Sequence, residues 1–357
     1  MDTVIPMFAV GILFHSVGAM LSANCYAPQK YIRRWSWETF WLTQAAWCWL
    51  LWPIIGAVCT IPEIGQVVAE SPKWPMLLAF LMGMAYGIGG TAFNISIRYI
   101  GFSLTYAIAV GLSSVIKTFV TPLVQGKIGE ILAKTGSGWV MLGVALGVAG
   151  IAVCGLAGRL KENDLRQQSG GSGEFSMVKG LLLSLVAGVL SAVYGLAMDD
   201  VCKPIVAVAS EHGAGVWKGN IAFPFVNTGT FLTVLIYTGY LLRRNRSLGE
   251  LTRVTEGPGR ASLGLNYLLA MLTGTLWYGQ FFFYNLGHVR LGKDYAFSSW
   301  AIHMILLVLI SNGVAILFKE WQGCGGRTKT AIGCGLAVLC AAVLLLTYGN
   351  YLGAPPQ

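Results

Sequence analysis

Charged residues are scarce in this sequence. Asp, Glu, Lys and Arg make up 11% of its 357 residues, whereas 55% of the residues are hydrophobic and the mean hydropathy is +0.65. A soluble globular domain needs more polar surface than such a composition supplies. The scarcity of charge therefore excludes a soluble protein and indicates one that crosses a membrane several times.

Motifs for catalysis, metal binding and ion conduction are absent as well. The loops hold no HExxH, GxSxG, Walker or DxD pattern, and the eight cysteines form no CxxC pair. These absences argue against a membrane enzyme, a zinc site and a disulfide framework. No segment resembles the repeated filter loops of a channel. We therefore expect neither an enzyme nor a bound metal or cofactor.

Ten apolar runs are long enough to span a bilayer, which takes about 20 residues per helix. We predict an all-α integral membrane fold with ten transmembrane helices. Only Asp2 precedes the first run as a charged residue, and no basic residue does, so we expect a retained helix rather than a cleaved signal peptide. The runs cover residues 4–27, 37–61, 74–98, 101–122, 138–158, 177–200, 219–242, 263–287, 294–318 and 329–352.

The basic residues are distributed unevenly among the segments between these runs. Sixteen of the 24 lysines and arginines lie at the connections after the first, third, fifth, seventh and ninth runs. Cytoplasmic loops of membrane proteins are enriched in Lys and Arg. This side is therefore expected to be cytoplasmic, which places both termini outside. The net charge of +9 then reflects topology and implies no nucleic-acid partner.

The second half of the chain repeats features of the first. A shift of 177 residues aligns Gly11 with Gly188, near the start of each half. Both this shift and a shift of 191 residues pair each predicted helix with the fifth helix after it in the chain. This second shift aligns Gly83 with Gly274, Tyr86 with Trp277, and Asn94 with Asn285.

Five helices per repeat is an odd number, so the second copy must lie inverted in the membrane. We predict one five-helix repeat over residues 1–158, a flexible cytoplasmic linker over 159–176, and a second repeat over 177–357. Inverted repeats are typical of secondary transporters, whose substrate site lies near mid-membrane between the repeats.

Three motifs resemble the L-rhamnose-proton symporter family of the drug/metabolite transporter superfamily. They are "CYAPQKYIRRWSWETFW" (25–41), "WYGQFFFYNLGHVRLGKDYAFSSWAIHM" (277–304) and "FKEW" (318–321). The resemblance runs over the whole chain. It implies a multi-pass carrier of the bacterial inner membrane, surrounded by lipid, that imports L-rhamnose or a similar 6-deoxyhexose with a proton. Sodium as the coupling ion and the oligomeric state stay open. Lys117 and the Asp199–Asp200 pair depart from the family pattern.

Polar and aromatic side chains within the spans are the candidate sugar-binding residues. Trp277, Gln280 and Tyr284 form one stripe with His288 on the eighth helix. Aromatic faces suit the C–H faces of a sugar, and amides and hydroxyls suit its hydroxyl groups. Trp277 can equally belong to the interfacial aromatic belt, and Gln44 and Asn94 can instead join two helices. The expected sugar-binding residues are His15, Gln44, Tyr86, Asn94, Trp277, Gln280, Tyr284, Asn285, Ser299 and Trp300.

Histidine titrates near neutral pH, and ionisable groups inside spans are usually functional. His303 shares a helix face with Ser299 and Trp300 and lies about 13 Å along the helix from Asp294. We expect His303, with His15 as the second candidate, to carry the coupling proton. The alternative is a neutral histidine that is hydrogen-bonded between helices.

Charged residues at the helix ends are expected to be gates or charge partners. Glu38 begins the second helix, where a carboxylate can cap the helix, pair with Arg33 or Arg34, or act as a gate. Lys117 and Asp199 both fall near the outer ends of their helices, where we expect a solvated mouth rather than a buried pair.

An alternative function is a drug/metabolite-type carrier that exports or exchanges another small polar metabolite. Exporters of cations are expected to hold a carboxylate within the first helix, and this chain has His15 there instead. The sequence therefore favours uptake of a neutral polar solute.

Overall fold

The computed structural model describes residues 7–100, 102–169, 176–253, 262–291 and 298–352. Every regular element within these ranges is a helix, and nine of the helical segments there are long and apolar enough to cross a membrane. The chain is therefore a multi-pass membrane protein, as its composition predicts. Helices dominate because lipid offers no hydrogen bonds, so the backbone must satisfy its own polar groups.

The eighth expected span is helix α13 (Leu263–Leu291), which has the length but not the apolar composition of the other nine. Its second half carries many of the polar and aromatic residues expected to bind the sugar. That α13 is a tenth span stays a prediction.

Backbone contacts divide the chain into two compact units. Unit 1 comprises residues 1–23, 89–195 and 283–357, and unit 2 comprises residues 24–88 and 196–282. Each unit takes segments from both halves of the chain. Helices α5 (Lys73–Ile100) and α13 each contribute to both units.

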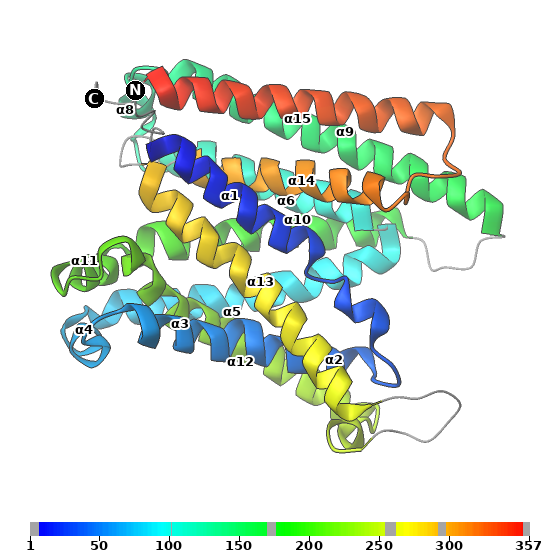
Figure 1. The fold of residues 1–357 in the computed structure, drawn as a ribbon, viewed down its shortest axis with the longest axis horizontal. Helices are drawn as coiled ribbons and strands as arrows, with labels where there is room; N and C mark the ends of the chain where they lie inside the picture. The colour runs from blue at the N-terminus through cyan, green and yellow to red at the C-terminus, as the bar shows by residue number, and fades with distance from the viewer. Residues whose placement is uncertain (1–6, 101, 170–175, 254–261, 292–297, 353–357) are drawn as a thin grey trace, which may run out of the picture. The chain divides into compact units, whose positions relative to one another are not determined.

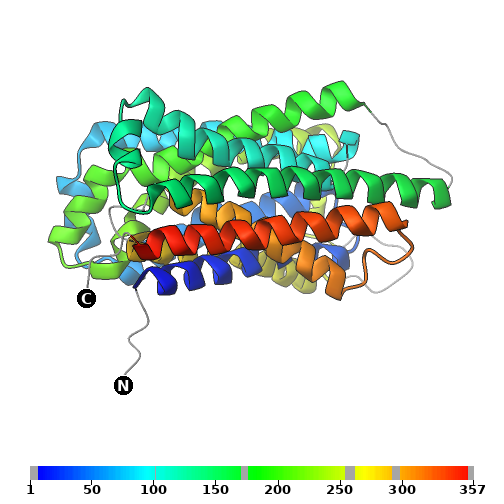
Figure 2. The ribbon, with the colours of Figure 1, turned by 90° about the horizontal axis from the view of Figure 1, so that it is seen from above.

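Unit 1 contains a closely packed helix pair, α9 and α15, which run side by side (Figures 1 and 2). A Cβ atom on Gly143 of α9 would lie 3.0 Å from the carbonyl oxygen of Ala342 on α15, so the glycine permits the close approach. The helices of this unit are α1 (Met7–Asn24), α6 (Phe102–Val115), α7 (Thr121–Val124), α8 (Ile128–Leu132), α9 (Ser137–Ser169), α10 (Met177–Leu196), α14 (Ser299–Leu317) and α15 (Gly326–Leu352).

The segment expected to be a flexible linker differs from that expectation over residues 159–169, which continue α9 as a helix. Residues 170–175 of the segment lie outside the described residues. Asp164 on this extension accepts hydrogen bonds from the backbone N–H of Gly325 (2.8 Å) and the hydroxyl of Thr328 (2.7 Å). Lys161 pairs with Glu320 (3.4 Å) and lies over the ring of Trp321. These contacts with the start of α15 and the turn before it explain why the helix continues.

Unit 2 is built around α12 (Ala222–Arg244), which packs on α2 (Trp37–Ala45) and α3 (Trp52–Thr60). It also meets α5, where a Cβ atom on Gly83 would overlap the carbonyl oxygen of Val226. Thr230 and Thr233 of α12 donate hydrogen bonds to the carbonyls of Gly83 and Met84, both at 2.9 Å. The remaining helical segments of this unit are η1 (Pro28–Tyr31), α4 (Ile64–Glu70), α11 (Lys203–Glu211), η5 (Gly215–Ile221) and η6 (Leu248–Leu251).

Three short stretches are π-helical turns: η2 (Ala46–Leu51), η3 (Ile116–Val120) and η4 (Ala197–Val201). Each holds a side chain that is unusual within a span, namely Trp49, Lys117 and Asp199. A π-turn accommodates one residue more than an α-helical turn and often marks a functional site.

Candidate functional site

Five of the expected site residues gather in unit 1. His15 comes from α1, Tyr284 from α13, and Ser299, Trp300 and His303 from the start of α14. Each side chain is at most 1% exposed. We call these five residues the histidine cluster.

The rings of the histidine cluster form a triangle. The ring centroids of His15 and His303 are 5.7 Å apart, and Tyr284 lies 5.3 Å from His15 and 5.4 Å from His303. Nε2 of His15 is 3.1 Å from the hydroxyl of Ser299. Nδ1 of His15 is buried and has no hydrogen-bond partner among the described residues. A buried polar atom in that state costs about 1–3 kcal/mol, so a functional reason for it is expected.

Two glycines place His15 against α13. A Cβ atom on Gly287 would lie 2.8 Å from the carbonyl oxygen of Gly11 and 2.9 Å from Nε2 of His15. The absence of both side chains lets α1 and α13 approach backbone to backbone. The repeat pattern identified Gly11 but missed Gly287, although a glycine one residue before His288 was a visible signal.

Trp300 is held by its own polar group. Its indole N–H donates to the hydroxyl of Ser113 on α6 (2.9 Å), and the hydroxyl of Ser113 donates to that of Ser191 (3.2 Å). The ring packs on Gly195 and faces Tyr284 at 5.5 Å. Trp300 therefore presents its ring to the cluster while its N–H is already used. Ser113 was not among the expected site residues.

His303 lies closer to the start of its helix than expected. Helix α14 begins at Ser299, which places His303 about 6 Å along the axis from that end. Asp294, from which a depth of about 13 Å was expected, lies outside the described residues. The His303 side chain is nevertheless fully buried, so its depth comes from the helices packed around it.

A second group of expected residues lies in unit 2, where four aromatic side chains form what we call the tryptophan wall: Trp41, Trp49, Tyr86 and Trp277. Trp49 meets Trp277 edge to face at 5.0 Å and Trp41 at 5.9 Å. Tyr86 lies 6.4 Å from Trp277. The three tryptophans are at most 7% exposed, which differs from the exposed position of an interfacial belt. Trp41 and Trp49 were not expected at the site.

The expected amide side chains have different surroundings. Oε1 of Gln44 accepts a weak hydrogen bond from the thiol of Cys48 (3.7 Å), and the amide of Asn94 donates to the carbonyl of Gly90 on its own helix (3.0 Å). Gln280 in unit 2 and Asn285 in unit 1 are both buried. Nδ2 of Asn285 has no hydrogen-bond partner within the described ranges.

Glu38 is buried at the start of α2, and its partners are neutral. Oε1 accepts hydrogen bonds from the amide of Asn245 (2.8 Å) and the hydroxyl of Ser247 (2.9 Å), just after α12. The helix is capped by Ser36 instead, whose hydroxyl accepts from the N–H of Thr39. Ser36, rather than Glu38, therefore caps α2. Glu38 instead joins the start of α2 to the segment just after α12.

Lys117 and Asp199 do not lie in a solvated mouth. Each side chain is only 8% exposed, Lys117 in unit 1 and Asp199 in unit 2, so the expectation of hydrated charges was wrong. Asp200 is more exposed and pairs with Lys203 at 2.8 Å. A single sequence gives a position along a helix but not the depth of the surrounding packing, which is why the burial was missed.

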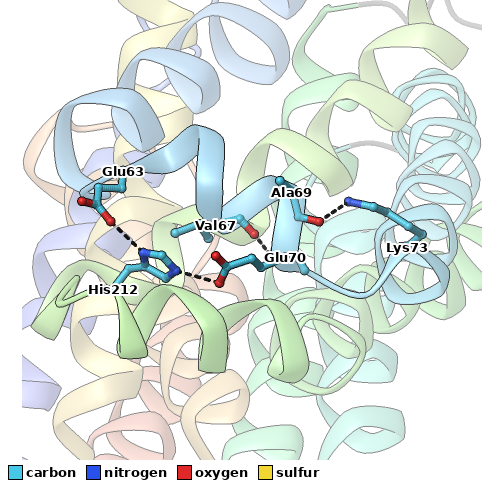
Figure 3. Close-up of polar contacts among 7 residues, drawn as sticks. Glu63, Val67, Ala69, Glu70, Lys73 and His212 are labelled. Carbon is cyan, nitrogen blue, oxygen red and sulfur yellow. Dashed lines mark hydrogen bonds and ion pairs between the residues drawn. The ribbon is translucent and has the colours of Figure 1, made fainter.

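An ionic clasp that the sequence did not suggest joins α4 to the end of α11 in unit 2 (Figure 3). Nδ1 of His212 is 3.0 Å from a carboxylate oxygen of Glu63, and Nε2 is 2.9 Å from one of Glu70. Lys73 donates to the carbonyls of Val68 and Ala69 at the end of α4. The hydrogen bonds to Glu70 and Glu63 raise the pKa of His212 above its ordinary value of 6.5.

The clasp is expected to weaken as pH rises. A raised pKa means that the stabilisation is complete below about pH 6.5 and is lost as pH rises through the pKa of folded His212. We expect the Tm of the purified protein to fall over that range, and His212→Gln to remove this part of the pH dependence. Lys73→Gln is the control, since it alters α4 without removing the titrating group. An equal pH dependence in His212→Gln would contradict this assignment.

Comparison with known proteins identifies the family. Residues 4–350 match the family model described as L-rhamnose-proton symport protein. Proteins named L-rhamnose-proton symporter from Cronobacter sakazakii and Mannheimia succiniciproducens are each 33% identical to this chain, over 95% and 96% of it and 97% and 98% of their own lengths. One from Pectobacterium atrosepticum is 32% identical over 94% of this chain and 96% of its own length. The chain therefore belongs to the L-rhamnose-proton symport protein family.

Proposed function

We propose that this protein is a secondary carrier that takes up L-rhamnose together with a proton across the bacterial inner membrane. Its family and the names of its relatives support this function. The observation that carries the proposal is the buried His15–His303 pair beside Tyr284. Histidine exchanges protons near neutral pH, and a buried pair of this kind suits proton coupling.

In the proposed mechanism the histidine pair holds one proton at a time. Two imidazolium rings at a centroid separation of 5.7 Å would repel each other strongly in a medium of low dielectric constant. Ser299, which bonds His15, orients the imidazole. Only the carrier loaded with both proton and sugar, or the empty carrier, changes between outward-open and inward-open states.

The neutral sugar requires ring faces and hydrogen-bond partners rather than charges. We propose that it binds at the tryptophan wall, with Gln44 and Gln280 as further polar groups. Helix α13 carries residues of both sites, because Trp277 and Gln280 precede Tyr284 on it. The remaining expected residues, Asn94, Asn285 and Trp300, stay candidates for contacts with the sugar.

We also propose ten spans in two inverted repeats with both termini outside. Matching contacts support this arrangement. Gly83 packs α5 against α12, and a Cβ atom on Gly274 of α13 would lie 2.8 Å from the carbonyl oxygen of Gln44 on α2. The contact at Gly83 joins the third and seventh proposed spans, and the contact at Gly274 joins the eighth and second. In the proposed repeat the third span corresponds to the eighth and the seventh to the second, so the two contacts are equivalent.

Proton uptake with the sugar gives a direct test. In lightly buffered, de-energised cells that express the protein, adding L-rhamnose is expected to raise the external pH, and other sugars are expected to leave it unchanged. Replacing sodium in the medium with choline is expected to have no effect. No pH change together with exclusion of labelled L-rhamnose would contradict the proposed function, and a response that requires sodium would contradict proton coupling.

A further inference from the structure

Two buried indole groups of the tryptophan wall have no hydrogen-bond acceptor. Trp41 and Trp49 are each 3% exposed, and neither Nε1 atom has a partner in the part of the chain that the structure describes. Trp52, on the next part of the same helical stretch, donates its indole N–H to the hydroxyl of Thr275 (2.8 Å). Most buried N–H groups are paired, because leaving one unpaired is costly. Two adjacent exceptions therefore point to an acceptor that is supplied by a ligand.

The backbone places these two side chains together by an irregular turn. Trp41 and Trp49 are eight residues apart, a spacing that would separate them by roughly 80° around a regular α-helix. The π-turn η2 (Ala46–Leu51) begins after Trp41 and includes Trp49. It accommodates one residue more than a regular α-helical turn. The rings consequently meet at 5.9 Å with an interplanar angle of 71°.

The surroundings of the two N–H groups match the chemistry of a sugar. Trp49 meets Trp277 at 5.0 Å, and Trp277 adjoins Tyr86 and Phe281, at 6.4 and 4.8 Å. Aromatic faces suit C–H groups, and indole N–H groups donate but cannot accept hydrogen bonds. A ligand that satisfies both features combines apolar C–H faces with oxygen acceptors, as a 6-deoxyhexose does.

We propose that the indole N–H groups of Trp41 and Trp49 donate hydrogen bonds to hydroxyl oxygens of the transported sugar and determine which hydroxyl pattern is accepted. This inference rests on the proposed function. It assigns a specific recognition role to two residues whose positions depend on the π-turn.

Binding of labelled L-rhamnose to the purified protein in lipid nanodiscs tests the proposal. Trp41→Phe and Trp49→Phe keep an aromatic ring but remove the N–H, so each is expected to raise the Kd about tenfold, the effect of one lost hydrogen bond. The matched control is Trp52→Phe, which loses the bond to Thr275 and is expected to keep the Kd within about twofold. If Trp41→Phe and Trp49→Phe both bind L-rhamnose with unchanged affinity while the native protein also binds it, this inference is overturned but the proposed function is not.

Sugars that lack one hydroxyl at position 2, 3 or 4 assign each contact. When the missing hydroxyl is the one that Trp49 recognises, the native protein is expected to bind the deoxy sugar about tenfold more weakly than L-rhamnose. Trp49→Phe is expected to bind that deoxy sugar and L-rhamnose with equal affinity. A lowered Tm with unchanged Kd would indicate packing alone and overturn the inference. Should a variant fail to fold, undiminished native affinity for all three deoxy sugars would overturn it. Failure of the native protein to bind any sugar would overturn the proposed function as well.

Discussion

Replacing His303 with asparagine is expected to preserve exchange of L-rhamnose across the membrane but to abolish its accumulation. Asparagine presents an amide N–H beside His15, as protonated His303 would, so the sugar-loaded variant can still reorient, but it cannot take up or release a proton. Moving one proton charge inward through 100 mV supplies about 2.3 kcal/mol, which corresponds to about 50-fold accumulation. The variant should therefore equilibrate labelled sugar without concentrating it.

Proteoliposomes with an imposed membrane potential separate the two activities. Exchange is measured with labelled sugar on one side and unlabelled sugar on the other, and accumulation is measured with sugar outside only. His15→Asn is expected to show the same loss if the pair shares one proton, and His212→Asn, outside the histidine cluster, is expected to behave as the native protein. A His303→Asn carrier that still concentrates L-rhamnose about 50-fold would exclude His303 as the proton carrier.

Gly83→Ala is expected to have the largest effect on folding. The new Cβ atom would overlap the carbonyl oxygen of Val226, and a backbone atom cannot rotate away as a side chain can. Helices α5 and α12 would have to separate, which would weaken the hydrogen bonds from Thr230 and Thr233. We expect the free energy of unfolding to fall by at least about 1–3 kcal/mol, which is the typical cost of overpacking.

Gly90→Ala on the same helix is the matched control, because no atom lies within 4 Å of its added Cβ atom. Alanine is favoured over glycine in a helix by about 1 kcal/mol, so this variant should be neutral or slightly stabilised. The Tm of both detergent-purified variants is the measurement. Similar Tm values for the two would show that α5 and α12 are less closely packed than described.

The sequence was sufficient to predict the helices and the polar residues within them. An apolar run of about 20 residues in lipid has few alternatives to a helix, because its backbone must be paired internally. His15 and His303 were identifiable for a related reason, since ionisable groups within spans are costly unless they serve a function. Their proximity was not predictable, because it depends on the approach of Gly11 to Gly287 between distant helices.

Other parts of the site depend on contacts that sequence periodicity does not encode. The hydrogen bonds of Glu38 come from Asn245 and Ser247, about 200 residues later. Trp41 and Trp49 are eight residues apart, which separates them by roughly 80° around a regular helix, so no narrow stripe of the sequence identified them. Lys117 and Asp199 were expected near water because helix ends usually reach it, but packing buries both side chains.

The π-turns also affect how relatives of this protein can diverge. A π-turn corresponds to a single codon inserted into the gene segment for a regular helix. Deleting one residue of η2 (Ala46–Leu51) ahead of Trp49 would restore a regular helix and leave the later side chains close to their present faces, because the π-turn already accommodates that extra residue. Trp41 and Trp49 would then be seven residues apart, about 20° around a regular helix, and would keep their shared face. A relative could therefore lack one codon in this helix and keep the same side-chain directions, whereas a sequence alignment without gaps would pair residues that point in different directions.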